Sequence, residues 1–167
     1  MFNFSARSLR AMQGVHPDLV RVLHRAIEMT SVDFIVTEGV RTQERQQQLV
    51  RAGASQTMNS RHLTGHAIDI APLIDYDGDG DKEIRWDWPL FFPIAEAFAS
   101  AGRNLHVPLR WGGVWDRRLN DLHDCAAEHA AYVARERRRQ IARGIRPDRT
   151  RVFVDGPHFE LPREIYT

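Results

Sequence analysis

The sequence has a single cysteine and no long hydrophobic run, and these absences exclude several classes of protein, whereas its single lysine decides nothing about function. With Cys125 alone, the chain has no intramolecular disulfide and no cysteine-rich zinc cluster. No apolar run approaches the ~20 residues of a transmembrane helix. Residues 1–12 lack an apolar stretch followed by a small-residue cleavage site, so no signal peptide is expected. Stability must therefore come from packing, helped by a bound ion where one exists.

The composition is that of a folded domain with nearly balanced charge. The 167 residues suit one domain, and 43% of them are hydrophobic, with four tryptophans, which is enough to build a core. Lys and Arg number 23 and Asp and Glu number 22, for a formal net charge of +1. This balance excludes a protein that coats nucleic acid through a general positive charge, and the apolar content excludes disorder of the whole chain.

Apolar spacing and capping residues predict an α+β fold, with a small, mainly antiparallel sheet that carries the site residues and helices packed on one side of it. The first two helices and the fourth are expected to supply most of the core. The expected helices are residues 5–12, 16–30, 42–52, 89–101 and 125–141, and the expected strands are residues 32–37, 66–71, 107–111, 152–154 and 158–161.

The densest chemical signal is the segment from Ser60 to Asp69. Imidazole and carboxylate both bind zinc, and His62 and Asp69 can converge on one ion if the chain turns back between them. His158 is the best candidate for a third ligand, and Asp155, three residues earlier, is placed to act as a general base. The alternative is that both histidines are ordinary surface or core residues and that Asp69 caps a turn.

The order of the motifs resembles a known family. Ser60-x-His62-x-x-Gly65-x-Ala67-x-Asp69, followed by Asp155-x-x-His158, resembles the zinc peptidases of the D-alanyl-D-alanine carboxypeptidase and VanX-like group. The chain is most similar to the branch of phage endolysins that are L-alanyl-D-glutamate peptidases. Supporting pieces occur in the expected order: residues 16–19, 38–42, 86–88, 110–113 and 156–160.

The resemblance implies a role for each matching residue. The fold is expected to be D-Ala-D-Ala carboxypeptidase/hedgehog-like, with Zn²⁺ held by His62, Asp69 and His158. Asp155 matches the catalytic carboxylate, and Arg41 matches the arginine that stabilises the developing oxyanion; without the family, Arg41 would be read as part of a salt bridge to Glu38 or Glu44. Expected substrate-binding residues are Ser60, whose alternative is a local hydrogen bond, and Trp111, whose alternative is the core.

The resemblance also implies a biological setting. The substrate is expected to be the peptide stem of peptidoglycan, cut between L-Ala and D-Glu during lysis of a phage host. The enzyme is expected to be a monomer that is made in the host cytoplasm and reaches the wall in the periplasm through a separate holin-type membrane protein. The alternatives are D-Ala-D-Ala carboxypeptidase or dipeptidase activity, a non-catalytic zinc-stabilised binding module, and nucleic-acid binding through residues 135–151.

Two segments depart from the family pattern. Asp75, Asp77, Asp79 and Gly80 match the first half of an EF-hand loop, but the twelfth position is Trp86 instead of Glu, so the loop is either a weak calcium site or a solvated acidic hairpin. Residues 116–151 are expected to be a helical, arginine-rich insertion within a single peptidase domain of residues 1–167. Its residues 135–151 are either a solvated helix and connector or a contact with an anionic polymer or surface.

Overall fold

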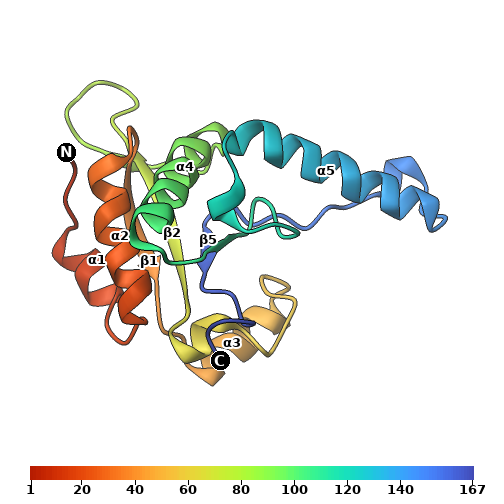
Figure 1. Ribbon diagram of the computed structural model, residues 1–167, viewed down its shortest axis with the longest axis horizontal. Helices are drawn as coiled ribbons and strands as arrows, with labels where there is room; N and C mark the ends of the chain where they lie inside the picture. The colour runs from red at the N-terminus through yellow and green to blue at the C-terminus, as the bar shows by residue number, and fades with distance from the viewer.

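A computed structural model describes all residues, 1–167, and shows an α+β protein built on one antiparallel sheet (Figure 1). Five strands form the sheet in the order β1-β2-β5-β4, with β3 pairing to the far end of β2. The strands are β1 (Asp33–Glu38), β2 (Ala67–Ile74), β3 (Glu83–Ile84), β4 (Arg110–Trp111) and β5 (His158–Glu160). The helices are α1 (Ala6–Ala11), α2 (Pro17–Met29), α3 (Gln43–Arg51), α4 (Trp88–Leu105) and α5 (Cys125–Ala142), and the 3₁₀ turns are η1 (Arg61–Thr64), η2 (Leu119–Asp121) and η3 (Pro147–Arg149). None of the helices is long and apolar enough to cross a membrane.

The helices begin where the sequence places capping groups. Ser5, Thr42 and Asp124 each accept a hydrogen bond from a backbone N–H in the first turn of their helix. Helix α4 runs four residues past its expected end, because Gly102 continues the helix and packs closely against Val107 and Leu109. These caps position the helices without any tertiary contact.

The two faces of the sheet have different environments, because side chains alternate along each strand. Phe34, Val36, Ile68, Ile70 and Phe159 face the core and are fully or almost fully buried. Against them pack the apolar sides of α2 and α4, where the Phe98 ring stacks on Phe159 with 4.1 Å between centroids. The expectation that the first two helices and the fourth supply most of the core is only partly correct: α2 and α4 contribute 12 of its 28 buried residues, and α1 contributes none.

The strand expected at residues 152–154 is wrong, and the strand expected at 107–111 is shorter than predicted. Residues 152–154 make no ladder; the nearest sheet-like contact is the Asp155 N–H donating to the carbonyl of Gly112 at 2.9 Å. Val152 and Val154 still pack against the core, which accounts for their apolar character. The apolar residues at 152 and 154 therefore indicate contact with the core and not strand pairing.

Helix α5 projects from the body of the molecule (Figure 1). Its buried residues are Cys125 and Tyr132, and every residue from Arg137 to Arg149 is exposed except the partly buried Gln140. We call residues 135–151, the far half of this projection and its return, the arginine arm.

Gly65 provides a test of the fold close to the site. Its φ is +71°, and a Cβ there would lie 2.4 Å from the carbonyl oxygen of Gly14. Gly65→Ala is expected to lower the free energy of unfolding by about 3 kcal/mol, since left-handed strain adds to a backbone clash. Gly53 has the same φ of +71° but open space around it, so Gly53→Ala should cost only about 1 kcal/mol. Urea unfolding measures both, and equal losses would contradict the packing explanation.

Candidate metal centre and active site

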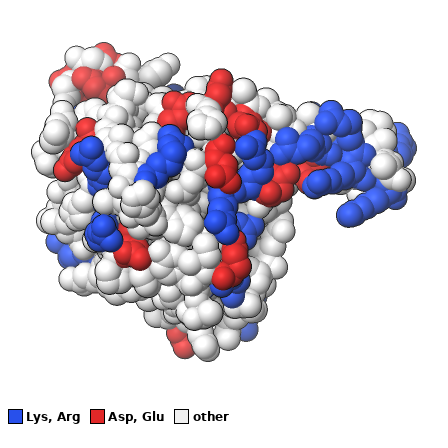
Figure 2. Space-filling view, viewed as in Figure 1, with Lys and Arg blue, Asp and Glu red and all other residues white.

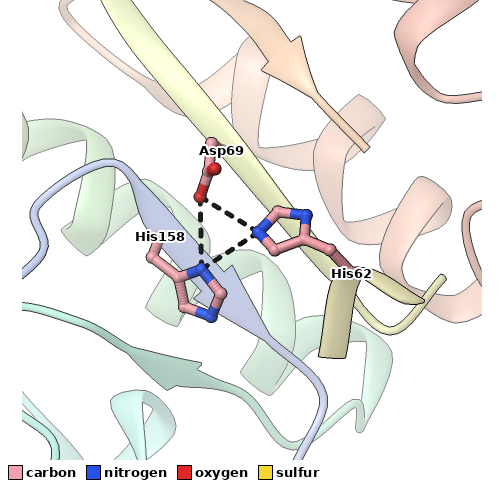
Figure 3. A group of neighbouring side chains, drawn as sticks. All are labelled: His62, Asp69 and His158. Carbon is pink, nitrogen blue, oxygen red and sulfur yellow. Dashed lines mark hydrogen bonds and ion pairs between the residues drawn. The ribbon is translucent and has the colours of Figure 1, made fainter. Parts of the chain in front are cut away.

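The structure brings three side chains from distant segments together at one point (Figure 3). His62 comes from η1, Asp69 from β2 and His158 from β5. The distances are 3.3 Å from His62 Nε2 to His158 Nδ1, 3.3 Å from His62 Nε2 to Asp69 Oδ1, and 3.2 Å from His158 Nδ1 to Asp69 Oδ1. The register of the sheet produces this convergence, because Asp69 pairs directly with His158 across β2 and β5.

The second nitrogen of each imidazole already has an acceptor. His62 Nδ1 lies 2.7 Å from the carbonyl oxygen of Gly39, and His158 Nε2 lies 3.0 Å from Glu160 Oε2. These contacts favour tautomers whose lone pairs, on His62 Nε2 and His158 Nδ1, face each other and the Asp69 carboxylate. Three electron-pair donors in this arrangement suit a cation between them, so the group could hold a metal ion.

The pKa shifts of His158 and Asp69 also indicate a site that suits a cation. Burial opposes charge on His158, but hydrogen bonds with Asp69 and Glu160 outweigh it and raise the pKa of this imidazole to about 10. Burial also opposes charge on Asp69, yet hydrogen bonds from His158 and His62 hold the pKa of its carboxyl well below the usual range. Without an ion, a proton therefore balances the carboxylates, and metal binding must displace that proton and weakens as the pH falls.

Arg41 is buried beside the candidate ligands. Its Nη1 donates to Gln46 Oε1 at 2.7 Å, and its Nη2 donates to Asp69 Oδ2 at 3.2 Å and to Glu38. The salt bridge to Glu38, expected as the alternative for Arg41, is therefore present, but the same guanidinium also holds Asp69. A bulge in β1 opposite Asp69 brings Glu38 to this side.

Asp155 lies in the turn before β5 and lines the same cleft. Its backbone N–H donates to the Gly112 carbonyl, and its own carbonyl accepts from the His158 N–H at 3.2 Å. A Cβ at Gly112 would lie 2.2 Å from the carbonyl oxygen of Asp155, so the close approach requires glycine there. The carboxylate makes no hydrogen bond, and its pKa is raised by burial and by the charge of Asp69.

The cleft around these residues has a volume of about 420 Å³ and is mainly polar. Ser60 lines it and also accepts a hydrogen bond from the His62 N–H, so the local hydrogen bond expected as the alternative is present and substrate binding by Ser60 stays a prediction. Trp111 does not line it: the side chain is fully buried, opposite Phe159 in the sheet, and its Nε1 donates to the Gly156 carbonyl. The aromatic walls are instead Trp115, whose ring lies 5.4 Å from that of His158, and Trp86.

The acidic loop of residues 75–87 follows β2, and its carboxylates at Asp75, Asp77 and Asp79 are exposed. Asp75, Asp77 and Asp79 lie close enough for one cation, but each accepts hydrogen bonds from backbone N–H groups of the loop. Asp87, next to the twelfth position, pairs with Arg85. The carboxylates thus stabilise the turn by themselves, and calcium binding stays a prediction.

Comparison with known proteins gives the family. The model of the phage L-alanyl-D-glutamate peptidase family matches residues 1–131. The chain belongs to this family. The L-alanyl-D-glutamate peptidase of Escherichia phage T5 is 35% identical over 127 residues, which are 74% of this chain and 88% of the relative. That of Listeria phage A118 is 30% identical over 97 residues, 58% of this chain and 31% of the relative.

A solved structure extends the similarity to the segment beyond residue 131. The crystal structure of the Serratia marcescens L-Ala D-Glu endopeptidase ChiX has a TM-score of 0.67 and 34% sequence identity, and covers 98% of this chain and 93% of its own. Asp155 and His158 lie outside the region matched by the phage L-alanyl-D-glutamate peptidase model. Their place beside His62 and Asp69 therefore depends on the geometry described above.

Three contributors to the site of this family member lie outside the residues that the sequence pattern indicated. Glu160 contacts His158, the Gly39 carbonyl contacts His62, and Trp115 walls the cleft. Glu160 had a usable signal, since it lies two residues from His158 and so faces the same side of a strand. The carbonyl of Gly39 carries no such signal, because any residue has one.

Glu160 offers a test of the second contact of His158. Glu160→Ala removes the acceptor for His158 Nε2 and is expected to weaken divalent metal binding about 10–100-fold. Glu160→Gln keeps an acceptor oxygen and should restore much of the loss. Zn²⁺ affinity measured against a chelating dye checks this, with exposed Glu164→Ala as control. Wild-type affinity in Glu160→Ala would show that this contact does not support the metal site.

Proposed function

We propose that this protein is a zinc metallopeptidase, a phage endolysin that hydrolyses the L-Ala–D-Glu bond in the peptide stem of peptidoglycan. One observation carries the proposal: the donor atoms of His62, Asp69 and His158 converge beside the unpartnered carboxylate of Asp155 in an open polar cleft. Membership of the phage L-alanyl-D-glutamate peptidase family supports the choice of bond.

The donor set supports zinc as the ion. Two imidazole nitrogens and one carboxylate oxygen form a common catalytic zinc set. Tetrahedral ligands about 2.0–2.1 Å from an ion lie roughly 3.3 Å from one another, close to the separations of 3.2 and 3.3 Å here. When bound, zinc would supply Lewis-acid polarisation of the scissile carbonyl and activation of the attacking water.

Asp155 is the proposed general base. Its carboxylate faces the cleft without a hydrogen-bond partner, so it is free to accept the proton of the attacking water. The raised pKa of its carboxyl makes it a stronger proton acceptor than an ordinary aspartate. The same carboxyl then delivers the proton to the nitrogen of the departing D-Glu as the amide bond breaks.

Arg41 is proposed to act in two ways. By holding Oδ2 of Asp69, it leaves Oδ1 directed at the two histidines. Its buried positive charge also lies beside the place where negative charge develops on the scissile carbonyl oxygen, which lowers the barrier electrostatically. Glu38 and Gln46 fix the guanidinium in that position.

The remaining expectations complete the proposal. The enzyme acts as a monomer on the wall, in the periplasm, after a separate holin-type membrane protein has opened the way from the host cytoplasm. Ser60 and Trp115 line the substrate cleft. The proposed calcium site consists of Asp75, Asp77 and Asp79, and calcium added to the metal-free protein should raise the melting temperature in a way that Asp77→Asn abolishes.

Digestion of purified peptidoglycan tests the reaction directly. Mass spectrometry of the products should find new N-terminal D-Glu. Release of D-Ala or D-Ala-D-Ala would favour the carboxypeptidase or dipeptidase alternative. Binding of peptidoglycan with no new termini would favour a non-catalytic module.

Asp155→Asn tests the mechanism. It is expected to lower kcat about 10²–10⁴-fold, because the amide cannot take the proton from water. Zinc content and melting temperature should remain those of the wild type, since Asp155 is not among the proposed ligands. Exposed Asp121→Asn serves as the control, and full activity of zinc-loaded Asp155→Asn would overturn the mechanism.

Removal of the metal tests its link to folding. The proposed ligands lie as far apart in the chain as residues 62 and 158, so an ion bound only by the folded state stabilises it. Chelation is expected to lower the melting temperature by about 10 °C, which follows from roughly 4 kcal/mol of binding energy in a domain of this size. Added Zn²⁺ should restore it, whereas an unchanged melting temperature after verified metal loss would refute the link.

A further inference from the structure

The arginine arm concentrates the positive charge of the protein at one end (Figure 2). It contains eight arginines against Glu136 and Asp148, a local charge of +6. Because the whole chain carries +1, the rest carries a formal −5. The acidic loop of residues 75–87 lies at the opposite end of the view, so the molecule is strongly polarised along its length.

Five of these eight arginines lack an acidic partner within the chain. Arg135 pairs with Asp116, Arg139 with Glu136 and Arg146 with Asp148, and Arg151 donates to backbone carbonyls. The remaining four, which are exposed and form no salt bridge, are Arg137, Arg138, Arg143 and Arg149. Exposed like charges held together without counter-charges attract anions.

The arm is held in shape while it projects into solvent. Gln140 Nε2 donates to the Arg151 carbonyl at 2.9 Å, and its Oε1 accepts from the Arg151 N–H at 3.0 Å. This pair ties the returning chain to the helix. The arm is therefore preorganised, which lowers the entropic cost of binding a partner.

The distribution of charge around the arginine arm distinguishes between a membrane surface and a polymer as its binding partner. Successive helical residues point about 100° apart, so Arg137, Arg138 and Arg139 lie on three different sides of α5. A helix that lies in a membrane surface needs one apolar face, and this helix has none in its far half. An arm with charges on several sides can instead bind a polymer network that surrounds it.

The returning end of the arginine arm lies near the cleft. Phe153, two residues beyond the arm, stacks on Trp115 with 5.8 Å between ring centroids and an interplanar angle of 14°. Trp115 and Asp155 both line the cleft. The returning end of the arm is therefore close to any polymer whose peptide stem occupies the cleft.

We infer that the arginine arm is a second binding element for the polymer whose stem peptides enter the cleft, and that it acts by binding their free carboxylates. The inference rests on the proposed function for the identity of that polymer, peptidoglycan. Guanidinium groups bind carboxylates through two parallel hydrogen bonds, so the arginines of the arm are well matched to the carboxylates of stem peptides. The negative body repels the same polymer, so the molecule is oriented with its arm and cleft toward the wall.

A matched pair of double variants tests the inference. R138Q/R143Q removes two unpartnered charges from the arm, and R7Q/R10Q removes two exposed, unpartnered charges from α1. Co-sedimentation of the full, zinc-loaded chain with purified sacculi measures binding, in an Asp155→Asn background that leaves the polymer intact. Hydrolysis of a soluble stem tetrapeptide by the same double variants with Asp155 present measures the cleft alone. Anionic vesicles and duplex DNA serve as competing probes.

R138Q/R143Q is expected to weaken sacculus binding about fivefold, from two exposed ion pairs, and to make it less sensitive to salt. R7Q/R10Q should bind like the wild type, and both should hydrolyse the soluble peptide normally. Equal sacculus binding by the two double variants would overturn the inference. So would arm-dependent binding to vesicles or DNA with unchanged binding to sacculi. Failure of the wild type to cut the soluble peptide would count against the proposed function, while sacculus binding would still decide the role of the arm.

Discussion

The pairing of Asp69 with His158 across β2 and β5 is the constraint on which the rest of the site depends. In this register, both side chains leave the sheet on the side away from the core, while Ile68, Ile70 and Phe159 enter the core. A slip of one residue would exchange the two sets and bury the carboxylate against α4. The hydrophobic core thus fixes the position of the candidate metal-binding group, because any other register would expose the apolar residues of β2 and β5.

Buried polar contacts orient the side chains that the strand register brings together. The Gly39 carbonyl and Glu160 orient the two imidazoles, and Arg41 holds Asp69 while being held by Glu38 and Gln46. Arg61, next to His62, donates to the carbonyls of Leu161 and Tyr166 and so ties η1 to the C-terminal segment. Such contacts in a low-dielectric setting are strong when every partner is present, and they keep the donor atoms in one arrangement. The cleft can therefore stay open and polar without losing its geometry.

Charge is distributed over this molecule in a way that fits a protein working on an acidic solid substrate. A nearly neutral chain is divided into a negative body and the positive arginine arm, and Phe153, two residues beyond the arm, stacks on the cleft residue Trp115. The acidic loop satisfies its carboxylates with its own backbone and contributes to the negative end. The arm proposed to bind the polymer and the cleft proposed to carry the reaction are thus neighbouring parts of the molecule.

Local patterns in the sequence determined the caps and spans of α1, α2, α3 and α5, the alternation of β2 and β5, and, through a family resemblance, the residues of the candidate site. These features depend on neighbours within a few positions, so a linear reading captures them. Tertiary structure alone decided that Trp111 is core and Trp115 is cleft wall, that Val152 and Val154 pack against the core without strand pairing, and that the Gly39 carbonyl orients His62. It also decided that the arm projects into solvent. Each depends on which distant segments pack together, and apolar or polar character at one position does not specify its partner.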